Sequence, residues 1–455
     1  MREQEEFFLN AQDFGKKFMW GVSTAAFQIE GAYNIDGKGP SIWDKFTTKP
    51  KAVLNGDNAK VSCDFYNKYK EDILLMKSMN FDNYRFSISW ARILPNGIGS
   101  VNDPGVQFYN NVINFCLEQG ITPWVTLYHW DLPQVLEDKG GWTNRNIIGW
   151  FSEFTQVCAN AFGDRVKHWM VLNEPMVFTG AGYFLGVHAP GKKRLKNFLP
   201  AAHHAVLCQA EGGRILRKAV PNAVIGTTFS CSQITPYRQN KRDRKTAIKV
   251  DALLNRLFFE PALGLGYPVK DAPVLKKLQP YIKASDMEDC KFDFDFIGIQ
   301  NYTREKVKYS ILVPYIRAKI VKASKRNVQT TLMDWEVYPP SIYNMIKKYS
   351  GYTQIKKIII TENGAAFKDT FTGDTVNDTE RVHFLQRYLE QVLKAKQDGL
   401  NVHGYFVWTF TDNFEWAEGY YPRFGLVHIN FKTLKRTIKA SGKWFSQFLS
   451  SKNQQ

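Results

Sequence analysis

Short apolar segments alternate with amphipathic segments along most of the chain, and this alternation is the strongest constraint on its fold. The apolar segments, rich in β-branched and aromatic residues, predict strands at residues 18–26, 81–88, 122–127, 167–172, 223–229, 294–299, 358–360 and 404–408. Apolar residues at helical spacing predict helices at residues 64–79, 108–119, 147–162, 201–219, 341–349 and 378–397. Strands that alternate with helices are typical of a parallel sheet.

These strand and helix units predict an α/β fold with a single (β/α)8 TIM barrel. The 455-residue chain is longer than a minimal barrel requires, and we expect the excess to lie in elaborated βα loops. Residues 1–455 are therefore expected to form one domain, with residues 1–13 as a frayed N-terminus. A doubly wound open sheet is the alternative, but its Gly-rich turn after the first strand is missing.

Cysteine usage and the lack of a leader bear on the cellular compartment. The six cysteines are scattered, no CxxC occurs, and no Cys/His spacing resembles a metal site, so we expect no metal. The sequence starts without a charged-then-apolar leader. Free, mostly buried thiols in a reducing cytoplasm are therefore expected. No apolar run is as long as a membrane span, so no membrane partner is expected either.

The formal net charge of +17 raises the question of a nucleic-acid partner. Basic residues cluster at 192–194, 238–245 and 304–326, in stretches with Gly, Pro, Asn and Ser that predict loops. No nucleic-acid-binding motif accompanies them. We interpret the clusters as solvated faces with weak attraction for anionic polymers, and expect no nucleic-acid partner.

A carboxylate follows the seventh predicted strand. The run that begins at Ile358 is interrupted at Glu362, and Asn363-Gly364 then predicts a turn. In a barrel, the carboxyl end of a buried strand is where ligands bind. Taken alone, this stretch favours the simpler interpretation that Glu362 begins a solvated loop.

Polar or aromatic residues follow the other strands as well: Gln28, Arg85, His129, Asn173, Glu174, Tyr302 and Trp408. In a barrel, all of them converge on one pocket at the carboxyl face. Two carboxylates in one pocket, Glu174 and Glu362, suit cleavage of a glycosidic bond, because one protonates the leaving oxygen while the other attacks or activates water. Spacing alone leaves open the alternative that two glutamates follow strands by chance.

Longer motifs run in one order through nearly the whole chain from Phe18 onward. They are residues 18–31, 70–72, 84–90, 126–133, 172–175, 361–364, 412–416, 421–426 and 435–444. In sequence and order, this set resembles glycoside hydrolase family 1. The resemblance implies one catalytic barrel, retaining chemistry and no cofactor.

The resemblance also implies a role for each matching residue. Glu362 would be the nucleophile and Glu174 the acid/base. Arg85 and Tyr302 would bond to Glu362 and, by favouring its charged form, lower its pKa. The sugar and its aglycone would be bound by Gln28, His129, Asn173, Glu415, Trp416, Trp408 (floor), Phe424 (wall) and Trp335 (aglycone platform).

By this resemblance, the chain would be a retaining β-glucosidase. Its partner would be a small-molecule β-glycoside, and it would release terminal non-reducing β-D-glucosyl residues from short oligosaccharides or from aryl and alkyl glucosides. The sequence assigns no oligomeric state. Two alternatives are a 6-phospho-β-glycosidase and a catalytically silent sugar-binding barrel. The pair Glu415-Trp416 argues against the first, because it places an anion where a 6-phosphate would lie; the presence of both glutamates argues against the second.

The sequence departs from the family pattern at several places, including Val171, where Thr is frequent. The usual Asn-Tyr-Tyr after the sixth strand is replaced by Gln300-Asn301-Tyr302. The loop at residues 306–330 is unusually basic and is expected near where the family admits the aglycone. We expect selectivity for the aglycone to differ at this loop.

Overall fold

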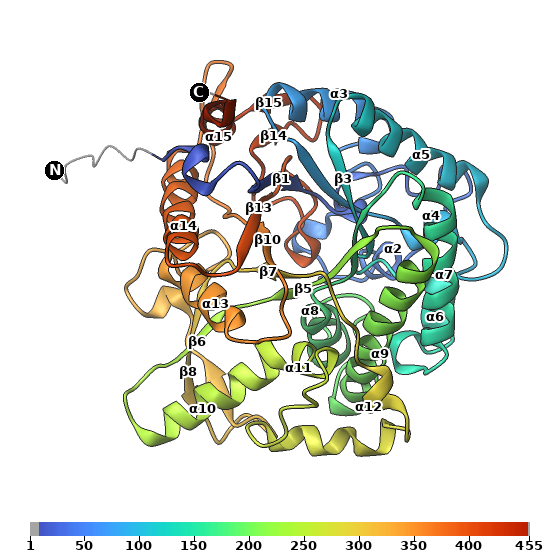
Figure 1. Cartoon of the computed structure of the whole chain (residues 1–455), viewed down its shortest axis with the longest axis vertical. Coiled ribbons are helices and arrows are strands. Elements are labelled where there is room, and N and C mark those ends of the chain that lie inside the picture. The colour runs from blue at the N-terminus through green and yellow to red at the C-terminus, as the bar shows by residue number, and fades with distance from the viewer. Residues whose placement is uncertain (1–8, 454–455) are drawn as a thin grey trace.

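The computed structural model describes residues 9–453 and contains a closed parallel barrel of strands in the spatial order β1-β13-β10-β7-β5-β4-β3-β2 (Figure 1). The barrel strands are β1 (Met19–Ser23), β2 (Asn83–Ser87), β3 (Thr122–Tyr128), β4 (His168–Asn173), β5 (Val224–Ser230), β7 (Phe296–Gln300), β10 (Ile358–Asn363) and β13 (Val402–Trp408). Every predicted strand is present. The closed sheet confirms the barrel and excludes the doubly wound alternative.

The long helices ring the barrel (Figure 1). They are α3 (Phe65–Ser78), α5 (Asp103–Glu118), α7 (Ile147–Phe162), α9 (Leu195–Ala219), α13 (Pro340–Ser350), α14 (Thr379–Gln397) and α15 (Ala440–Ser450). In α7, Phe151, Phe154 and Cys158 are buried at helical spacing, which shows why this segment packs against its neighbours as a helix. The predicted helices are confirmed, although α5 and α9 begin several residues earlier than predicted.

Shorter elements occupy the connections between these strands and helices. They are α1 (Ala26–Ile29), α2 (Ile42–Phe46), α4 (Trp90–Ile93), α6 (Gln134–Asp138), α8 (Pro175–Thr179), α11 (Phe259–Ala262), α12 (Asp286–Asp289), β11 (Thr370–Thr372), β12 (Thr375–Asn377), β14 (Val427–Ile429) and β15 (Arg436–Ile438). A π-helical segment, Gly180–Leu185, follows α8 directly.

Two of the basic clusters predicted as loops are regular structure instead. Residues 241–251 form helix α10 (Lys241–Asp251), whose first turn is capped by the Asn240 side chain. Strands β6 (Gln233–Pro236), β8 (Arg304–Tyr309) and β9 (Ala318–Ile320) form a separate three-stranded sheet. The loop prediction failed because Val307, buried between charged neighbours, gives β8 an inner face that composition alone does not reveal.

The barrel interior is filled by a cluster of large apolar side chains from five strands: Trp124, Met170, Phe296, Ile359 and Phe406. This packed layer closes the barrel below its carboxyl face, as expected for a TIM barrel. The Met170 sulfur lies 3.1 Å from Nε of Arg85, so the core directly supports one of the polar side chains above it.

The chain termini and cysteines complete the comparison with the sequence. Residues 1–8 lie outside the described residues, but the predicted fraying is wrong for residues 11–13. Residues Ala11–Phe14 form a 3-10 turn, and the Ala11 N–H donates to Oγ of Ser451 at 3.0 Å. All six cysteines are buried and free, as predicted. In the described part of the chain, no helix combines the length and apolar character that a membrane crossing requires.

Candidate active site

Glu174 and Glu362 line the same cavity, which has a volume of about 300 Å³. Glu362 lies near the end of β10, and Glu174 follows β4 directly. The backbone of Glu174 is in the left-handed region at φ 44°, and its N–H donates to the Thr228 carbonyl at 3.0 Å. A left-handed glutamate is uncommon, and such backbone conformations concentrate at functional sites. Pro175 then begins α8, so the chain turns sharply at this carboxylate.

Three donors hold the carboxylate of Glu362. Arg85 Nη1 donates to Oε1 at 2.5 Å, and Tyr302 Oη donates to Oε2 at 2.6 Å, so the structure brings both predicted partners to Glu362. Gln300 Nε2 also donates to Oε1, at 2.7 Å. A carboxylate fixed at both oxygens has one orientation, which suits a nucleophile that must approach a single carbon atom.

The two carboxyl groups differ in pKa because their surroundings differ. Burial raises the pKa of Glu174 well above its usual value, and the charge of Glu362 raises it further. Burial also raises the pKa of Glu362, but Arg85 and Tyr302 oppose this rise. The predicted net lowering at Glu362 is therefore wrong, because desolvation outweighs both donors. The pKa of Glu362 is still the lower of the two, so Glu362 loses its proton before Glu174. A pair with one ionised and one protonated carboxyl group results.

The side-chain amide of Asn173 lies between Arg85 and His129, and these two neighbours fix its orientation. Asn173 Oδ1 accepts from Arg85 Nη2 at 2.5 Å, and Arg85 has only donors, so the amide nitrogen must face His129. That nitrogen lies 3.0 Å from His129 Nε2. Burial, then the charge of Arg85, lowers the pKa of His129 well below its usual value, so its ring is neutral. Nε2 accepts, and the proton therefore resides on Nδ1.

Several buried polar atoms have no hydrogen-bond partner among the described residues, and two of them, His129 Nδ1 and Gln28 Oε1, belong to predicted sugar-binding residues. The amide nitrogen of Gln28 donates to Oε2 of Glu415 at 3.3 Å and to the Phe414 carbonyl at 3.0 Å. Unpaired buried polar atoms are costly, so they indicate groups that pair with a ligand. A neutral donor and an amide acceptor suit the hydroxyl groups of a sugar.

Glu415 lines the cavity, is partly buried, and has an unusual protonation state. Burial raises its pKa to about 8, with a further contribution from the charge of Glu362. At pH 7 the side chain is therefore mostly neutral. This weakens the prediction that Glu415 repels a 6-phosphate. A different observation now bears on phosphate: among the described residues that line the cavity, none is lysine or arginine.

Aromatic rings form one wall of the cavity. The ring centroids of Tyr302 and Trp335 lie 5.1 Å apart, and those of Trp335 and Phe424 lie 6.0 Å apart. Trp408 and Trp416 both stack near His129, each with its ring centroid 5.9 Å from the imidazole. All these predicted aromatic residues line the cavity. Gln28 and Asn173 are buried behind it and contact lining residues instead.

Comparison with known proteins identifies the family. Residues 10–454 match the model of glycosyl hydrolase family 1. The chain belongs to glycosyl hydrolase family 1. The 1,4-beta-D-glucan glucohydrolase of Thermotoga neapolitana is 42% identical over 96% of this chain and 98% of its own length. Beta-glucosidase A of Thermotoga maritima is 41% identical over 97% and 99%.

Solved structures of family 1 agree with this assignment. The Thermotoga maritima beta-glucosidase in complex with deoxynojirimycin superimposes with a TM-score of 0.93 at 40% identity, covering 96% of this chain and 99% of that one. The same enzyme in complex with glucoimidazole gives a TM-score of 0.91. Both comparisons extend the similarity from sequence to the whole barrel.

Gln300 is the residue whose role the sequence did not reveal. It departs from the family 1 pattern, yet its amide donates to Glu362 and to Oδ1 of Asn173 at 2.8 Å. Asn301, the other departure, is turned away from the cavity and donates to the Cys231 carbonyl and the Ser341 hydroxyl. Gln300 thus supports the carboxylate of Glu362, and Asn301 supports backbone and side-chain groups outside the cavity.

Replacing Gln300 with leucine is expected to lower kcat/KM for an aryl β-glucoside by about 10- to 100-fold, because a hydrogen bond to a charged group is lost. The acid limb of the pH profile should also move to higher pH, since a donor that stabilises ionised Glu362 is missing. Gln209→Leu removes a buried amide that contacts Thr227 instead, and serves as the matched control. An unchanged acid limb in Gln300→Leu would contradict this role.

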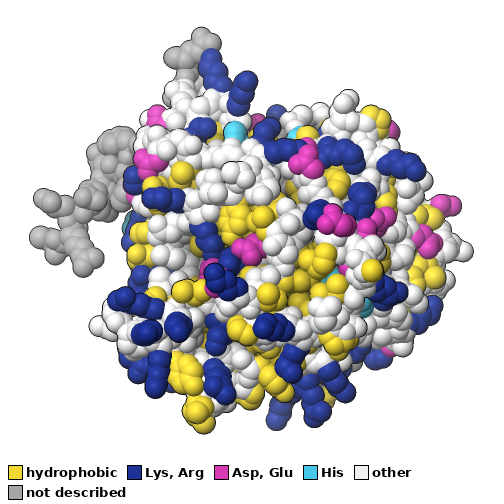
Figure 2. All heavy atoms as spheres, turned by 60° about the horizontal axis from the view of Figure 1, so that its bottom comes forward, with side chains coloured by type: hydrophobic (Ala, Val, Ile, Leu, Met, Phe, Trp, Pro, Cys, Tyr) yellow, Lys and Arg dark blue, Asp and Glu magenta, His cyan; other side chains and the backbone are white. Residues whose placement is uncertain are grey.

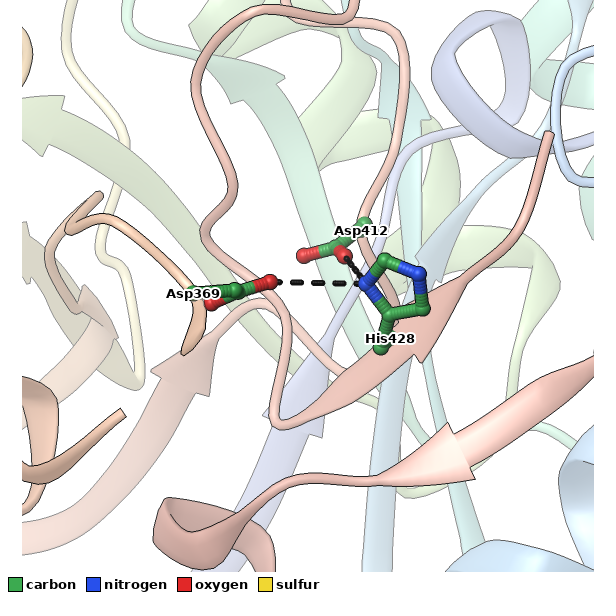
Figure 3. Close-up of side chains that lie close together, drawn as sticks. All are labelled: Asp369, Asp412 and His428. Carbon is green, nitrogen blue, oxygen red and sulfur yellow. Dashed lines mark hydrogen bonds and ion pairs between the residues drawn. The ribbon is translucent and has the colours of Figure 1, made fainter. Parts of the chain in front are cut away.

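A buried ion network holds the loop that carries Glu415. Figure 3 shows Asp369, Asp412 and His428 together, with Nδ1 of His428 3.3 Å from Asp412 and 3.4 Å from Asp369. Their grouping could suggest a metal site. Nζ of Lys439, however, lies 2.7 Å from Asp412 and 2.8 Å from Asp369, so an ammonium group already supplies the positive charge. The donor set does not fit a metal ion.

Replacing Lys439 with methionine is expected to destabilise the protein by about 3–5 kcal/mol, because two buried carboxylates lose their main partner. Chemical denaturation followed by tryptophan fluorescence measures this loss. Lys435→Met is the control, since that side chain is 68% exposed and its change should stay within about 0.5 kcal/mol. Equal stability of the two variants would show that the network contributes nothing.

Proposed function

We propose that this chain is a retaining β-glucosidase that works by double displacement, with Glu362 as nucleophile and Glu174 as acid/base. The observation that carries the proposal is the unequal environment of two carboxyl groups in one cavity. Glu362 accepts from a guanidinium and a phenol, whereas Glu174 has no cation within hydrogen-bond distance among the described residues. Such a pair keeps one group ionised and the other protonated.

In the first step, Glu174 protonates the glycosidic oxygen while Oε of Glu362 attacks the anomeric carbon from the opposite side. The bond to the aglycone breaks, the aglycone leaves as an alcohol, and a glucosyl ester forms on Glu362. In the second step, Glu174 removes a proton from water, and that water attacks the anomeric carbon. The ester breaks, glucose leaves with its β-configuration retained, and both glutamates return to their starting states.

The remaining residues of the site are proposed to hold the glucosyl group. Gln28, His129, Asn173 and Glu415 would hydrogen-bond the hydroxyls, and contact with the 2-hydroxyl by Asn173 would tighten as positive charge develops on the ring. Trp416 would also contact the hydroxyls, Trp408 would form the floor beneath the ring, and Phe424 would line the wall. Trp335 would be the platform for the aglycone. A neutral, protonated Glu415 can both donate and accept, which suits two adjacent hydroxyls.

The proposal extends to the chain as a whole. We take residues 1–455 as one catalytic domain that needs no cofactor, with a small-molecule β-glycoside as its partner and with neither nucleic acid nor membrane. A cytoplasmic location is supported by six buried thiols that form no disulfide. A 6-phospho-β-glycosidase and a silent sugar-binding barrel are the alternatives; the first is disfavoured by the lack of a cation among the described lining residues.

Trapping with a 2-deoxy-2-fluoro β-glucoside tests this function. The fluorine slows hydrolysis of the glucosyl ester, so mass spectrometry of the digested enzyme should find the sugar on the Glu362 peptide. A label on another peptide, or no label together with no turnover, would refute the assignment. Cellobiose should be hydrolysed faster than its 6-phosphate derivative, and the reverse preference would favour the phospho-glycosidase alternative.

A further inference from the structure

A second cavity of about 460 Å³ lies beside the catalytic one and is almost entirely apolar. Its walls come from α8, the π-helical segment Gly180–Leu185, the start of α9, the end of α10, a second π-helical segment Ala252–Arg256, the 3-10 segment Pro273–Tyr281, β9 and the connection between β8 and β9. Representative lining residues are Phe184, Leu199, Leu253, Val274, Val313 and Ile316. No charged side chain is found among the described residues that line it. Its volume is within the usual range of ligand pockets.

The two cavities adjoin at the acid/base. Val177, Ser230 and Ser232 line both of them. Val177 lies on α8, the helix that begins immediately after Glu174, and the Ser230 side chain is close enough to the Glu174 carboxyl group to oppose the rise in its pKa. The carboxyl group that would protonate the leaving oxygen therefore lies beside residues that both cavities share. An aglycone that extends past Glu174 in this direction would point toward the apolar cavity.

The cavity also opens to solvent, so a ligand can reach it. Leu185 and Tyr315 line it, and these residues are 56% and 59% exposed. On the face of the molecule that carries α10 and β8, hydrophobic side chains come to the surface between lysines and arginines (Figure 2). Contiguous exposed apolar surface often marks a binding site, whereas apolar residues scattered singly over a surface do not.

We propose, resting on the function given above, that the preferred β-glucosides carry a long apolar aglycone, such as an alkyl or isoprenoid chain, and that this chain lies in the second cavity. A second sugar would fit poorly there. A glucosyl unit has several hydroxyls to satisfy, whereas the described wall offers few polar side chains and no charge. An apolar chain needs no such partners and gains from leaving water.

A homologous series of alkyl β-glucosides, from methyl to decyl and each kept below its critical micelle concentration, tests this inference. Each methylene that enters the cavity should raise kcat/KM by about three- to fourfold, the factor that corresponds to about 0.8 kcal/mol. A flat series, in an enzyme that hydrolyses methyl glucoside and cellobiose, would overturn the inference while leaving the proposed function intact.

Binding of the matching alkyl thioglucosides, measured by calorimetry, tests the apolar cavity independently of catalysis. If the chain hydrolysed no β-glucoside, the proposed function would fail. The dissociation constants would still decide about the cavity: a steady fall with chain length supports an apolar binding site, and a constant value refutes it.

Val313→Asp places a charge in the wall of the second cavity. It should reduce the ratio of kcat/KM for octyl to that for methyl glucoside by about tenfold or more, because the chain then faces a group that must stay hydrated. Leu312→Asp is the matched control, since the neighbouring side chain is 88% exposed and does not line the cavity. Ala318→Trp, which fills the cavity from β9, should lower the same ratio independently. An unchanged ratio in both lining variants would overturn the inference.

Discussion

The Glu362→Ala variant is expected to hydrolyse an aryl β-glucoside about 10⁴- to 10⁶-fold more slowly than the wild type, the range found when a nucleophile is removed. The reason is specific to this site. Arg85, Tyr302 and Gln300 hold the carboxylate at 2.5–2.7 Å, and none of these donors can attack the anomeric carbon in its place. Initial rates with 2,4-dinitrophenyl β-glucoside measure the effect.

Added azide provides a sharper test of the same variant. Removal of the side chain leaves room for a small anion beside Arg85, so azide should restore turnover and yield the α-glucosyl azide, with the configuration inverted. Glu288→Ala is a suitable control, because that carboxylate is 77% exposed on α12 and should leave the rate unchanged. Wild-type activity in Glu362→Ala, or a β-configured azide product, would contradict the assigned role.

The Glu174→Gln variant is expected to show the second largest effect, and its size should depend on the leaving group. Cellobiose needs its leaving oxygen protonated, so kcat/KM should fall by about 10²- to 10⁴-fold. An aryl glucoside with an acidic phenol needs little protonation and should lose much less in its first step. An equal loss for both substrates would show that Glu174 does not act as the acid.

The pH profile of kcat/KM gives an independent measure of both groups. Burial raises the pKa of Glu174 well above its usual value, and the nearby charge of Glu362 adds to this. As pH rises through that pKa, the acid is lost and the rate falls; as pH falls through the lower pKa of Glu362, the nucleophile becomes protonated and the rate falls again. In Glu174→Gln the alkaline limb should disappear while the acid limb remains.

The barrel and the two glutamates could be predicted because both depend on short-range signals. The strand at Ile358 is a continuous β-branched run, as expected for a strand buried on both faces, and Glu362 closes it. Parallel strands bring their carboxyl ends together whatever the loops do. That rule places Arg85 and Tyr302 in the same pocket as Glu362. Their contacts with Glu362 are implied by the resemblance to family 1, and both contacts are present in the structure.

The Gln300 contact, the pKa of Glu362 and the apolar cavity depend on strand register or on tertiary packing, and neither can be read directly from the sequence. Gln300 contacts Glu362 because β7 and β10 pair with these two residues in register. The adjacency of the sixth and seventh strands in the chain is the one sequence signal that points to Gln300 as a neighbour of Glu362. The net rise in the pKa of Glu362 comes from burial, which depends on the whole surrounding structure. The apolar cavity is built from loops and inserted elements, so no single motif encodes it.

Closure of the barrel has a consequence for how the protein is made. Strand β1 pairs on one side with β2 and on the other with β13, from Met19↔Gly404 to Ser23↔Trp408. A ribosome therefore releases the first strand long before its second neighbour has been synthesised. Until then, one edge of β1 is unpaired and exposes backbone groups that can pair with other chains. We expect nascent chains truncated before Val402 to need protection from aggregation, and only chains that extend through β13 to become protease-resistant.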